Sequence, residues 1–72
     1  MEMTAGEKLR IIMDRMKISM GQMADGTGQS RQNLSNKMKR DDFSEKELRK
    51  MAEVLGCTIN IQFIDSDGNV IL

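Results

Sequence analysis

Apolar residues recur along most of the chain at the spacing of an α-helix. Between Thr4 and Lys17 they form one face of a helix with 3.6 residues per turn, and the members of this face are Leu9, Ile12, Met13 and Met16. Later helical stripes contain Met23, Leu34, Met38, Leu48, Met51, Ala52 and Leu55. We therefore expect four helices, at about 4–17, 20–27, 31–39 and 45–55, after a frayed end at residues 1–3.

Hydroxyl residues and glycines mark where these helices begin and end. Thr4, Ser19 and Ser44 are each followed three residues later by Glu or Gln, which is the spacing of a capping box. Gly28 and Gly56 follow the second and fourth stripes, where a helix end favours a residue that tolerates the left-handed conformation. The start and end signals agree with the apolar pattern.

After Cys57 the period of the pattern changes from about four residues to two. Ile59, Ile61 and Phe63 alternate with polar residues, and Asp67 with Gly68 forms a strong turn signal before a short apolar segment. We predict a β-hairpin with strands at about 58–64 and 69–72, and expect Cys57 to pack beneath it. The predicted fold class is mainly α: a small helix-turn-helix domain of four helices with a C-terminal β-hairpin.

An isolated two-stranded hairpin is marginally stable, and its open edge needs a cover. Pairing with a second copy would provide one, whereas the alternative is a hairpin folded back on its own helices. In the first case the apolar hairpin residues form a dimerisation element: Ile59, Ile61, Phe63, Val70, Ile71 and Leu72.

The segment from Ile18 to Arg40 has the sequence form of a helix-turn-helix unit, with Gly28 in the turn and Ser30 as the N-cap of the second helix. Four polar residues on the outer face of that helix are of types that pair with base edges in the major groove: Arg31, Gln32, Ser35 and Asn36. Residues suited to phosphate contacts are Ser19, Ser30, Lys37, Lys39 and Arg40. The alternative interpretation is a surface helix with an ordinary solvated face.

Charge is segregated along the chain although the net charge is zero. Residues 1–40 hold eight Lys and Arg against four Asp and Glu, whereas residues 41–72 hold three against seven. The half with the net charge of +4 contains the predicted helix-turn-helix. Because local charge governs attraction to phosphates, double-stranded DNA remains a plausible partner with weak non-specific binding.

Size and composition exclude several other classes. With 72 residues the chain forms one small domain, 1–72, whose core can hardly enclose a deep catalytic pocket. One cysteine and no histidine exclude an intrachain disulfide and a cysteine and histidine zinc set, so we expect no enzyme, no metal and no cofactor. Asp41 and Asp42 are adjacent carboxylates, but no other metal-ligating residues accompany them, so we expect no metal or acid-base site there. No signal peptide or membrane span is apparent, which predicts a cytoplasmic protein without a membrane partner.

Methionine is frequent, with eight in the chain. A pliable binding groove is one interpretation, but five of them fall on helical stripes, where methionine fills irregular gaps in a core. These five are Met13, Met16, Met23, Met38 and Met51.

The segment from Ile18 to Met38 resembles the helix-turn-helix of the phage repressor and Cro family, also called the xenobiotic-response-element family of bacterial regulators. The residues that carry the resemblance are Ile18, Ser19, Gln22, Met23, Ala24, Gly28, Ser30, Leu34 and the polar set on the following helix. Two departures lie in the first helix. Met20 stands where the family often has a phosphate-binding Gln, and Gly21 and Gly26 replace better helix formers.

The resemblance implies a sequence-specific DNA-binding transcriptional regulator, acting as a homodimeric repressor. The alternative is a protein-interaction module, or the antitoxin half of a toxin pair, with the same fold and weak or no DNA binding. Met20, the two glycines and the zero net charge favour that alternative.

Overall fold

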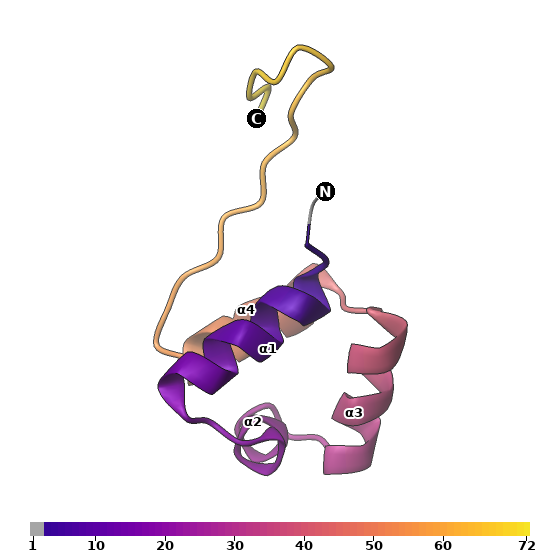
Figure 1. Cartoon of the computed structure of the whole chain (residues 1–72), viewed down its shortest axis with the longest axis vertical. Coiled ribbons are helices and arrows are strands. Elements are labelled where there is room, and N and C mark those ends of the chain that lie inside the picture. Colours follow the sequence, from indigo (N-terminus) through magenta and orange to yellow (C-terminus); the bar gives the residue numbers. More distant parts are fainter. Residues whose placement is uncertain (1–2) are drawn as a thin grey trace.

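The computed structural model describes residues 3–72 and contains four α-helices in that range. They are α1 (Ala5–Met16), α2 (Met20–Gly26), α3 (Arg31–Arg40) and α4 (Glu45–Val54), followed by a long segment that leaves the helical body (Figure 1). Each helix begins and ends within one residue of its predicted boundary, so the helical part of the prediction is confirmed. The frayed end expected at residues 1–3 falls mostly outside the described range.

All four helices begin at a hydroxyl side chain that accepts a hydrogen bond from a backbone amide in the first turn. Only α2 has a complete capping box, in which the Ser19 amide also donates to Oε1 of Gln22 at 2.8 Å. In α4 the Ser44 hydroxyl accepts from the Glu47 amide at 3.1 Å, but the Glu47 side chain bonds to another helix instead. The predicted caps are confirmed, but the boxes predicted for α1 and α4 are only half formed, because neither N-cap amide donates to the side chain of Glu7 or Glu47.

The core lies where α1, α2, α3 and α4 meet, and its fully buried side chains are Met23, Leu34 and Met51. Four of the five methionines assigned to core stripes are buried. Met16 is the exception: it is the last residue of α1 and is 48% exposed, so its assignment to the core was wrong. After it, Lys17 adopts a left-handed conformation that ends the helix before the stripe can continue inward.

Helix α2 packs closely against both α3 and α4. A Cβ atom added at Gly26 would lie 2.6 Å from Cγ2 of Val54 on α4, closer than carbon atoms approach without repulsion. No comparable neighbour surrounds Gly21, where the nearest atom is Oγ of Ser19 at 3.9 Å. The glycine at position 26 therefore permits the approach of two helices, whereas the structure gives no such reason for the glycine at position 21.

The predicted β-hairpin is not formed as two strands. Within residues 3–72 there is no β-strand, and the segment 57–72, which we call the C-terminal arm, contains one isolated bridge between Ile64 and Val70. The turn signal was correct, since the Asp65 amide donates to the Asn69 carbonyl at 2.8 Å and Gly68 has φ of 86°. In the described residues the returning segment pairs with the predicted first strand only as far as Phe63, whose amide donates to the Leu72 carbonyl at 2.7 Å.

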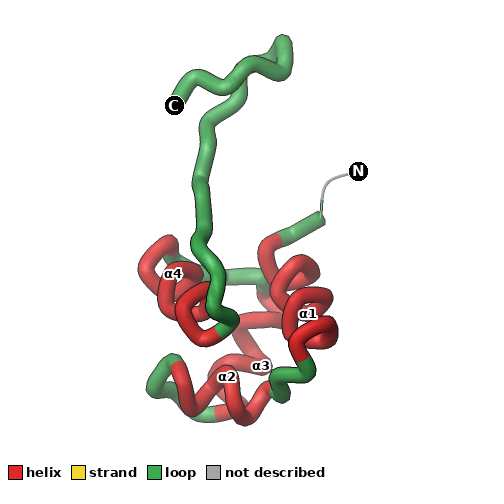
Figure 2. Tube along the Cα trace, turned by 90° about the vertical axis from the view of Figure 1, so that its left-hand side faces the viewer, coloured by secondary structure: helices red, strands yellow, loops and turns green. Residues whose placement is uncertain are grey.

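The arm extends away from the helices in both views (Figures 1 and 2). After Cys57, whose amide donates to the Ala52 carbonyl at 2.9 Å, residues 58–62 take part in no backbone hydrogen bond with the rest of the described chain. Cys57 itself is exposed, which contradicts the expectation that it packs beneath a hairpin. A two-stranded pairing without a covering layer gains too little from burial to hold the whole arm in a sheet.

Candidate nucleic-acid interface

The turn between α2 and α3 is held by a backbone hydrogen bond on the α2 side and by a side-chain cap on the α3 side. Gly28 has φ of 69°, a conformation that favours glycine, and it allows the next amide, that of Gln29, to donate to the Ala24 carbonyl at 3.0 Å. Ser30 then caps α3 by accepting from the Asn33 amide at 3.1 Å. The chain thus passes from one helix to the next with little freedom.

Buried residues fix the rotation of α3 about its own axis. Leu34 is fully buried and Met38 is 5% exposed, so the opposite side of the helix faces solvent. The exposed polar residues on α3 are Arg31, Gln32, Asn33, Asn36, Lys39 and Arg40. Ser35 is half-buried and lies at the edge of this face. Of the four predicted base-reading residues, three are therefore exposed and one is partly covered.

The side chains predicted to contact phosphate lie at both ends of the helix-turn-helix. Lys39 and Arg40 are exposed in the last turn of α3. Ser19 and Ser30 are exposed N-cap residues whose oxygens accept hydrogen bonds from amides, at 3.1 Å in each case. Each hydroxyl keeps its proton, which can be donated to a phosphate oxygen.

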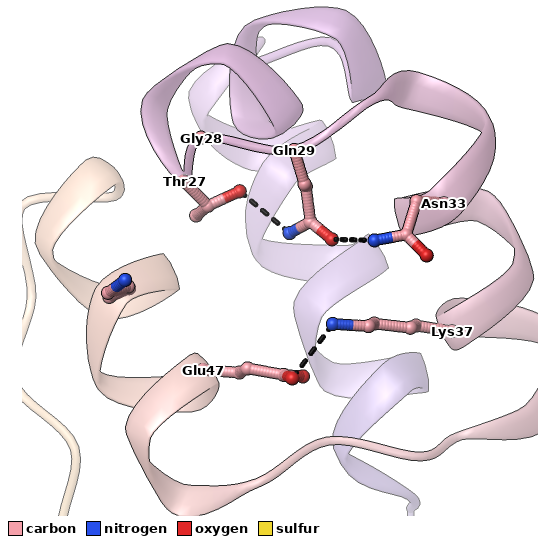
Figure 3. A pocket seen from close by; sticks show the side chains of 7 residues that line it. Thr27, Gly28, Gln29, Asn33, Lys37 and Glu47 are labelled. Atoms are coloured by element: carbon pink, nitrogen blue, oxygen red, sulfur yellow. Dashed lines mark hydrogen bonds and ion pairs between the residues drawn. The ribbon is translucent and has the colours of Figure 1, made fainter.

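Lys37 differs from the other residues of this set. Its Nζ donates to Oε1 of Glu47 on α4 at 2.8 Å, and its side chain is only 21% exposed (Figure 3). This hydrogen bond, and the positive charge behind it, lower the pKa of Glu47 below its usual 4.5 against the opposing effect of desolvation. Lys37 is thus turned toward α4, and its ammonium is already engaged within the protein.

The ion pair borders a cavity of about 240 Å³ between the turn and α4. Oε2 of Glu47 is buried there without a hydrogen-bond partner within residues 3–72, which reduces the net gain from the pair. The cavity is polar, and Lys50 also lines it. It is a junction between α3 and α4 with no group of three metal-ligating side chains in the described chain.

A chain of three side-chain contacts connects the end of α2 to the first turn of α3. Nδ2 of Asn33 donates to Oε1 of Gln29 at 3.1 Å, and Nε2 of Gln29 donates to Oγ1 of Thr27 at 2.8 Å (Figure 3). The Thr27 hydroxyl in turn donates to the Met23 carbonyl at 2.9 Å. Sequence reasoning missed Gln29 and Asn33, although their separation of four residues across a helix start was a usable signal.

The far end of α3 is connected to α1. Asp41, the residue that ends α3, accepts a hydrogen bond from the Gly6 amide through its carboxylate Oδ1 at 2.7 Å. This amide is one of those that the first turn of a helix leaves without a partner, and a carboxylate there also complements the helix dipole. Of the acidic pair, Asp41 therefore caps the first turn of α1 from the end of α3.

A family model for the Cro/C1-type HTH DNA-binding domain matches residues 8–60. The chain belongs to this family. Neither the search of curated proteins nor the search of solved structures found a significant match.

As a member of the Cro/C1-type family, the protein is a DNA-binding protein with a helix-turn-helix that acts in transcription regulation, as the sequence predicted. The match extends from α1 through α4 and ends at residue 60, near the base of the C-terminal arm. No helix among residues 3–72 is long and apolar enough to cross a membrane. A family of DNA-binding domains is also consistent with the expectation that the protein is not an enzyme.

Proposed function

We propose that this Cro/C1-type protein is a homodimeric repressor that reads its operator with α3 in the major groove. The observation that carries the proposal is the polar outer face of α3, held toward solvent by the burial of Leu34 and Met38. Base contacts come from Arg31, Gln32, Ser35 and Asn36. Arg forks onto guanine, while Gln and Asn pair with adenine, so this face can distinguish base pairs. Repression follows from occupying promoter DNA.

Phosphate contacts come from Ser19, Ser30, Lys39 and Arg40, which flank the reading face. We leave Lys37 out of this set because its ammonium is paired with Glu47 at 2.8 Å and would have to give up that pair to reach DNA. The remaining contacts lie in the half of the chain with net charge +4, which favours approach of this side to DNA.

A dimer is proposed because one short helix reads only a few base pairs. A twofold pair places two copies of α3 on half-sites about one DNA turn apart, which doubles the base contacts. The contact between copies is assigned to the apolar residues of the C-terminal arm, namely Ile59, Ile61, Phe63, Val70, Ile71 and Leu72. Most of these are exposed in the single chain, as a surface awaiting a partner would be.

The test is a selection from genomic DNA fragments over several rounds, followed by fluorescence anisotropy across a salt series. A repressor of this kind enriches a short, roughly palindromic site whose affinity falls steeply with salt. Placing that site in a promoter upstream of a reporter then separates repression from activation. If no fragment is enriched even at low salt, α3 does not read DNA, and the protein-interaction or antitoxin function takes its place, with copurification of a partner as its first test.

Gln32→Ala tests the base-reading assignment directly. The substitution removes a side chain that can bond bidentately to adenine, so binding to the selected site should weaken by ~1 to 3 kcal/mol, and preference should relax at one position of each half-site. Anisotropy against a set of single-base operator variants measures both effects. Asn33→Ala is the matched control for base preference: it removes a contact within the protein, from Asn33 to Gln29, so any loss of binding should be the same for all operator variants. Unchanged discrimination in Gln32→Ala would remove this residue from the reading face.

A further inference from the structure

Lys37 is a cation of α3 that is turned away from the exposed polar face of this helix. Its neighbours one turn away on the helix surface are Asn33 and Arg40, both exposed, whereas the Lys37 side chain is only 21% exposed. Nζ of Lys37 instead donates to Oε1 of Glu47 on α4 at 2.8 Å (Figure 3). The four-carbon stem of a lysine is long and flexible enough to place the same ammonium beside its exposed neighbours. The contact with Glu47 therefore decides where this charge lies.

Glu47 makes this contact in preference to two others within its own helix. It is the third residue of α4, where the side chain of a capping box accepts from the N-cap amide, but here only the Ser44 hydroxyl and the Glu47 amide are bonded, at 3.1 Å. Lys50 follows three residues later on α4 and lines the same cavity, yet it forms no ion pair within residues 3–72. The carboxylate thus engages the cation of the neighbouring helix.

Stability alone gives little reason for a carboxylate at this position. Oε2 of Glu47 is buried without a hydrogen-bond partner among the described residues, which offsets part of the gain from the bond to Oε1. The pair is partly buried, and an apolar pair at such a junction is often as stable or more stable. An effect of Glu47 on the charge of α3 explains the residue better.

We propose that Glu47 is a specificity-determining residue that does not touch DNA: it holds Lys37 away from phosphates and keeps sequence-independent binding weak. This inference rests on the proposed reading of DNA by α3 and adds a residue of α4 to it. A free lysine strengthens binding to every sequence, because every nucleotide carries a phosphate. Complexes at non-operator sequences compete with the operator for the protein, so their strength limits specificity.

A free Lys37 strengthens the non-specific complexes more than the operator complex. On non-operator DNA no base contact fixes the protein, which can take whichever position brings the ammonium to a phosphate. On the operator the proposed base contacts of Gln32 and Asn36 fix the position of α3, and the ammonium is limited to the phosphates within reach of that position. The ratio of operator affinity to non-specific affinity is therefore higher while Glu47 holds Lys37.

The first test measures Glu47→Gln and the unmodified chain by anisotropy, on the selected site and on a scrambled duplex, across a salt series. The substitution keeps the shape of the side chain and removes its charge. Affinity for the scrambled duplex should rise about fivefold per copy at physiological salt, and the slope of log affinity against log salt should steepen by ~0.9 per copy. Affinity for the selected site should rise less. An equal rise on both duplexes, or no rise on either, would overturn the proposal.

Removal of any acidic charge strengthens attraction to DNA to some degree, so the matched control is Glu45→Gln. This variant removes the same charge from the first turn of the same helix, where Glu45 pairs with Arg49 at 3.2 Å and both side chains are more than half exposed. It should change both affinities by the same small factor and leave the salt slope as it is. A loss of specificity equal to that of Glu47→Gln would assign the effect to net charge and refute the role of Glu47.

The second test removes the ammonium itself. Lys37→Met keeps an apolar stem, and in the otherwise unmodified chain it should leave the affinity for the scrambled duplex and its salt slope unchanged. Combined with Glu47→Gln, it should cancel the rise in affinity. A slope reduced by ~0.9 per copy in Lys37→Met alone would show that Lys37 already contacts phosphate, which would overturn the proposal even if Glu47→Gln does not fold. Far-ultraviolet circular dichroism identifies the variants that keep their helices.

These outcomes also separate the role of Glu47 from the proposed function. If the unmodified chain binds neither duplex, α3 does not read DNA, and both proposals fail. If the chain selects a site and Glu47→Gln selects it equally well, the proposed function stands and only the role of Glu47 is refuted.

Discussion

Asp41 connects two helices, because it ends α3 and caps the first turn of α1. It ends α3 in a left-handed conformation with φ of 53°, which Asp tolerates better than most residues, and its carboxylate accepts from the Gly6 amide of α1 at 2.7 Å. A Cβ atom at Gly6 would lie 2.9 Å from the same carboxylate oxygen, so the glycine is part of the contact. The position of α3 at its far end therefore depends on two residues that sequence patterns treat as a loop and a weak helix former.

Asp41→Ala should lower the free energy of unfolding by about 1 to 2 kcal/mol, because it removes a helix cap and places a side chain without polar groups at positive φ. Asp41→Asn should cost less, since the amide oxygen can still accept the hydrogen bond. Urea unfolding measures both, and Asp42→Ala is the control, as that neighbouring carboxylate makes no side-chain hydrogen bond in the described structure. Equal costs at positions 41 and 42 would contradict the role of the cap.

Glu47 makes the stability depend on pH. Its pKa is lowered in the folded protein, chiefly by the hydrogen bond from Lys37, so the ionised form is favoured by folding. This contribution is complete above the unfolded pKa, near 4.5, and is lost as the pH falls through 4.5 toward the lower folded value.

Urea unfolding between about pH 7 and about pH 3 should therefore show a steeper loss of stability below about pH 4.5 in the unmodified chain than in Glu47→Gln. Glu45→Gln serves as the control, because Glu45 pairs with Arg49 at 3.2 Å where both side chains are more than half exposed. If the two substitutions reduce the pH dependence equally, the pair of Glu47 with Lys37 contributes no more to stability than the exposed pair of Glu45 with Arg49.

At the scale of elements, α2 shows that replacing a glycine with a better helix former does not always stabilise a helix. Intrinsic propensity predicts that Ala at either glycine of this helix would stabilise it by up to ~1 kcal/mol. At Gly26, however, the two γ carbons of Val54 lie 2.6 Å and 3.3 Å from the position of a Cβ atom, and a β-branched side chain cannot rotate both away.

Gly26→Ala should therefore destabilise the protein by ~1 to 2 kcal/mol, because the overpacking exceeds the gain in helix propensity. Gly21→Ala, in the same helix, should be neutral or stabilising, since the nearest atom lies 3.9 Å away. Thermal unfolding compares the two. Addition of Val54→Ala should recover part of the loss in Gly26→Ala, and a failure to do so would place the cost elsewhere in α2.

The elements that the sequence predicted correctly are those determined by local patterns. Helical stripes, hydroxyl caps and the glycines at positions 28 and 56 each act within a few residues, and the four helices follow them. The arm was mispredicted because alternation favours a strand only when another segment pairs with it, and residues 58–62 have no backbone hydrogen-bond partner within residues 3–72. Lys37 and Glu47 lie ten residues apart in the sequence and on two different helices, so no local pattern could remove Lys37 from the predicted phosphate contacts.

At the scale of the whole molecule, the helix-turn-helix lies in the basic half of the chain and the arm in the acidic half. If the basic half faces DNA and the arms join two copies, the net charge of zero is compatible with binding, because phosphates meet local charge rather than the total. Binding to DNA then depends on a few Lys and Arg side chains, and removal of any one of them should change the slope of log affinity against log salt.

Lys39→Ala should weaken binding to all DNA sequences alike. It should also reduce the slope of log affinity against log salt by ~0.9 per copy, or ~1.8 per dimer, because a phosphate that is no longer contacted keeps its counterion. Arg49→Ala removes the same charge from α4 beside the base of the arm, where Arg49 and Cys57 line one hollow, and should leave the slope unchanged. Anisotropy titrations across salt, on the selected site and on a scrambled one, distinguish the variants. A loss confined to the selected site would place Lys39 among the base-reading residues and move the phosphate contacts to Arg40 and the two capping serines.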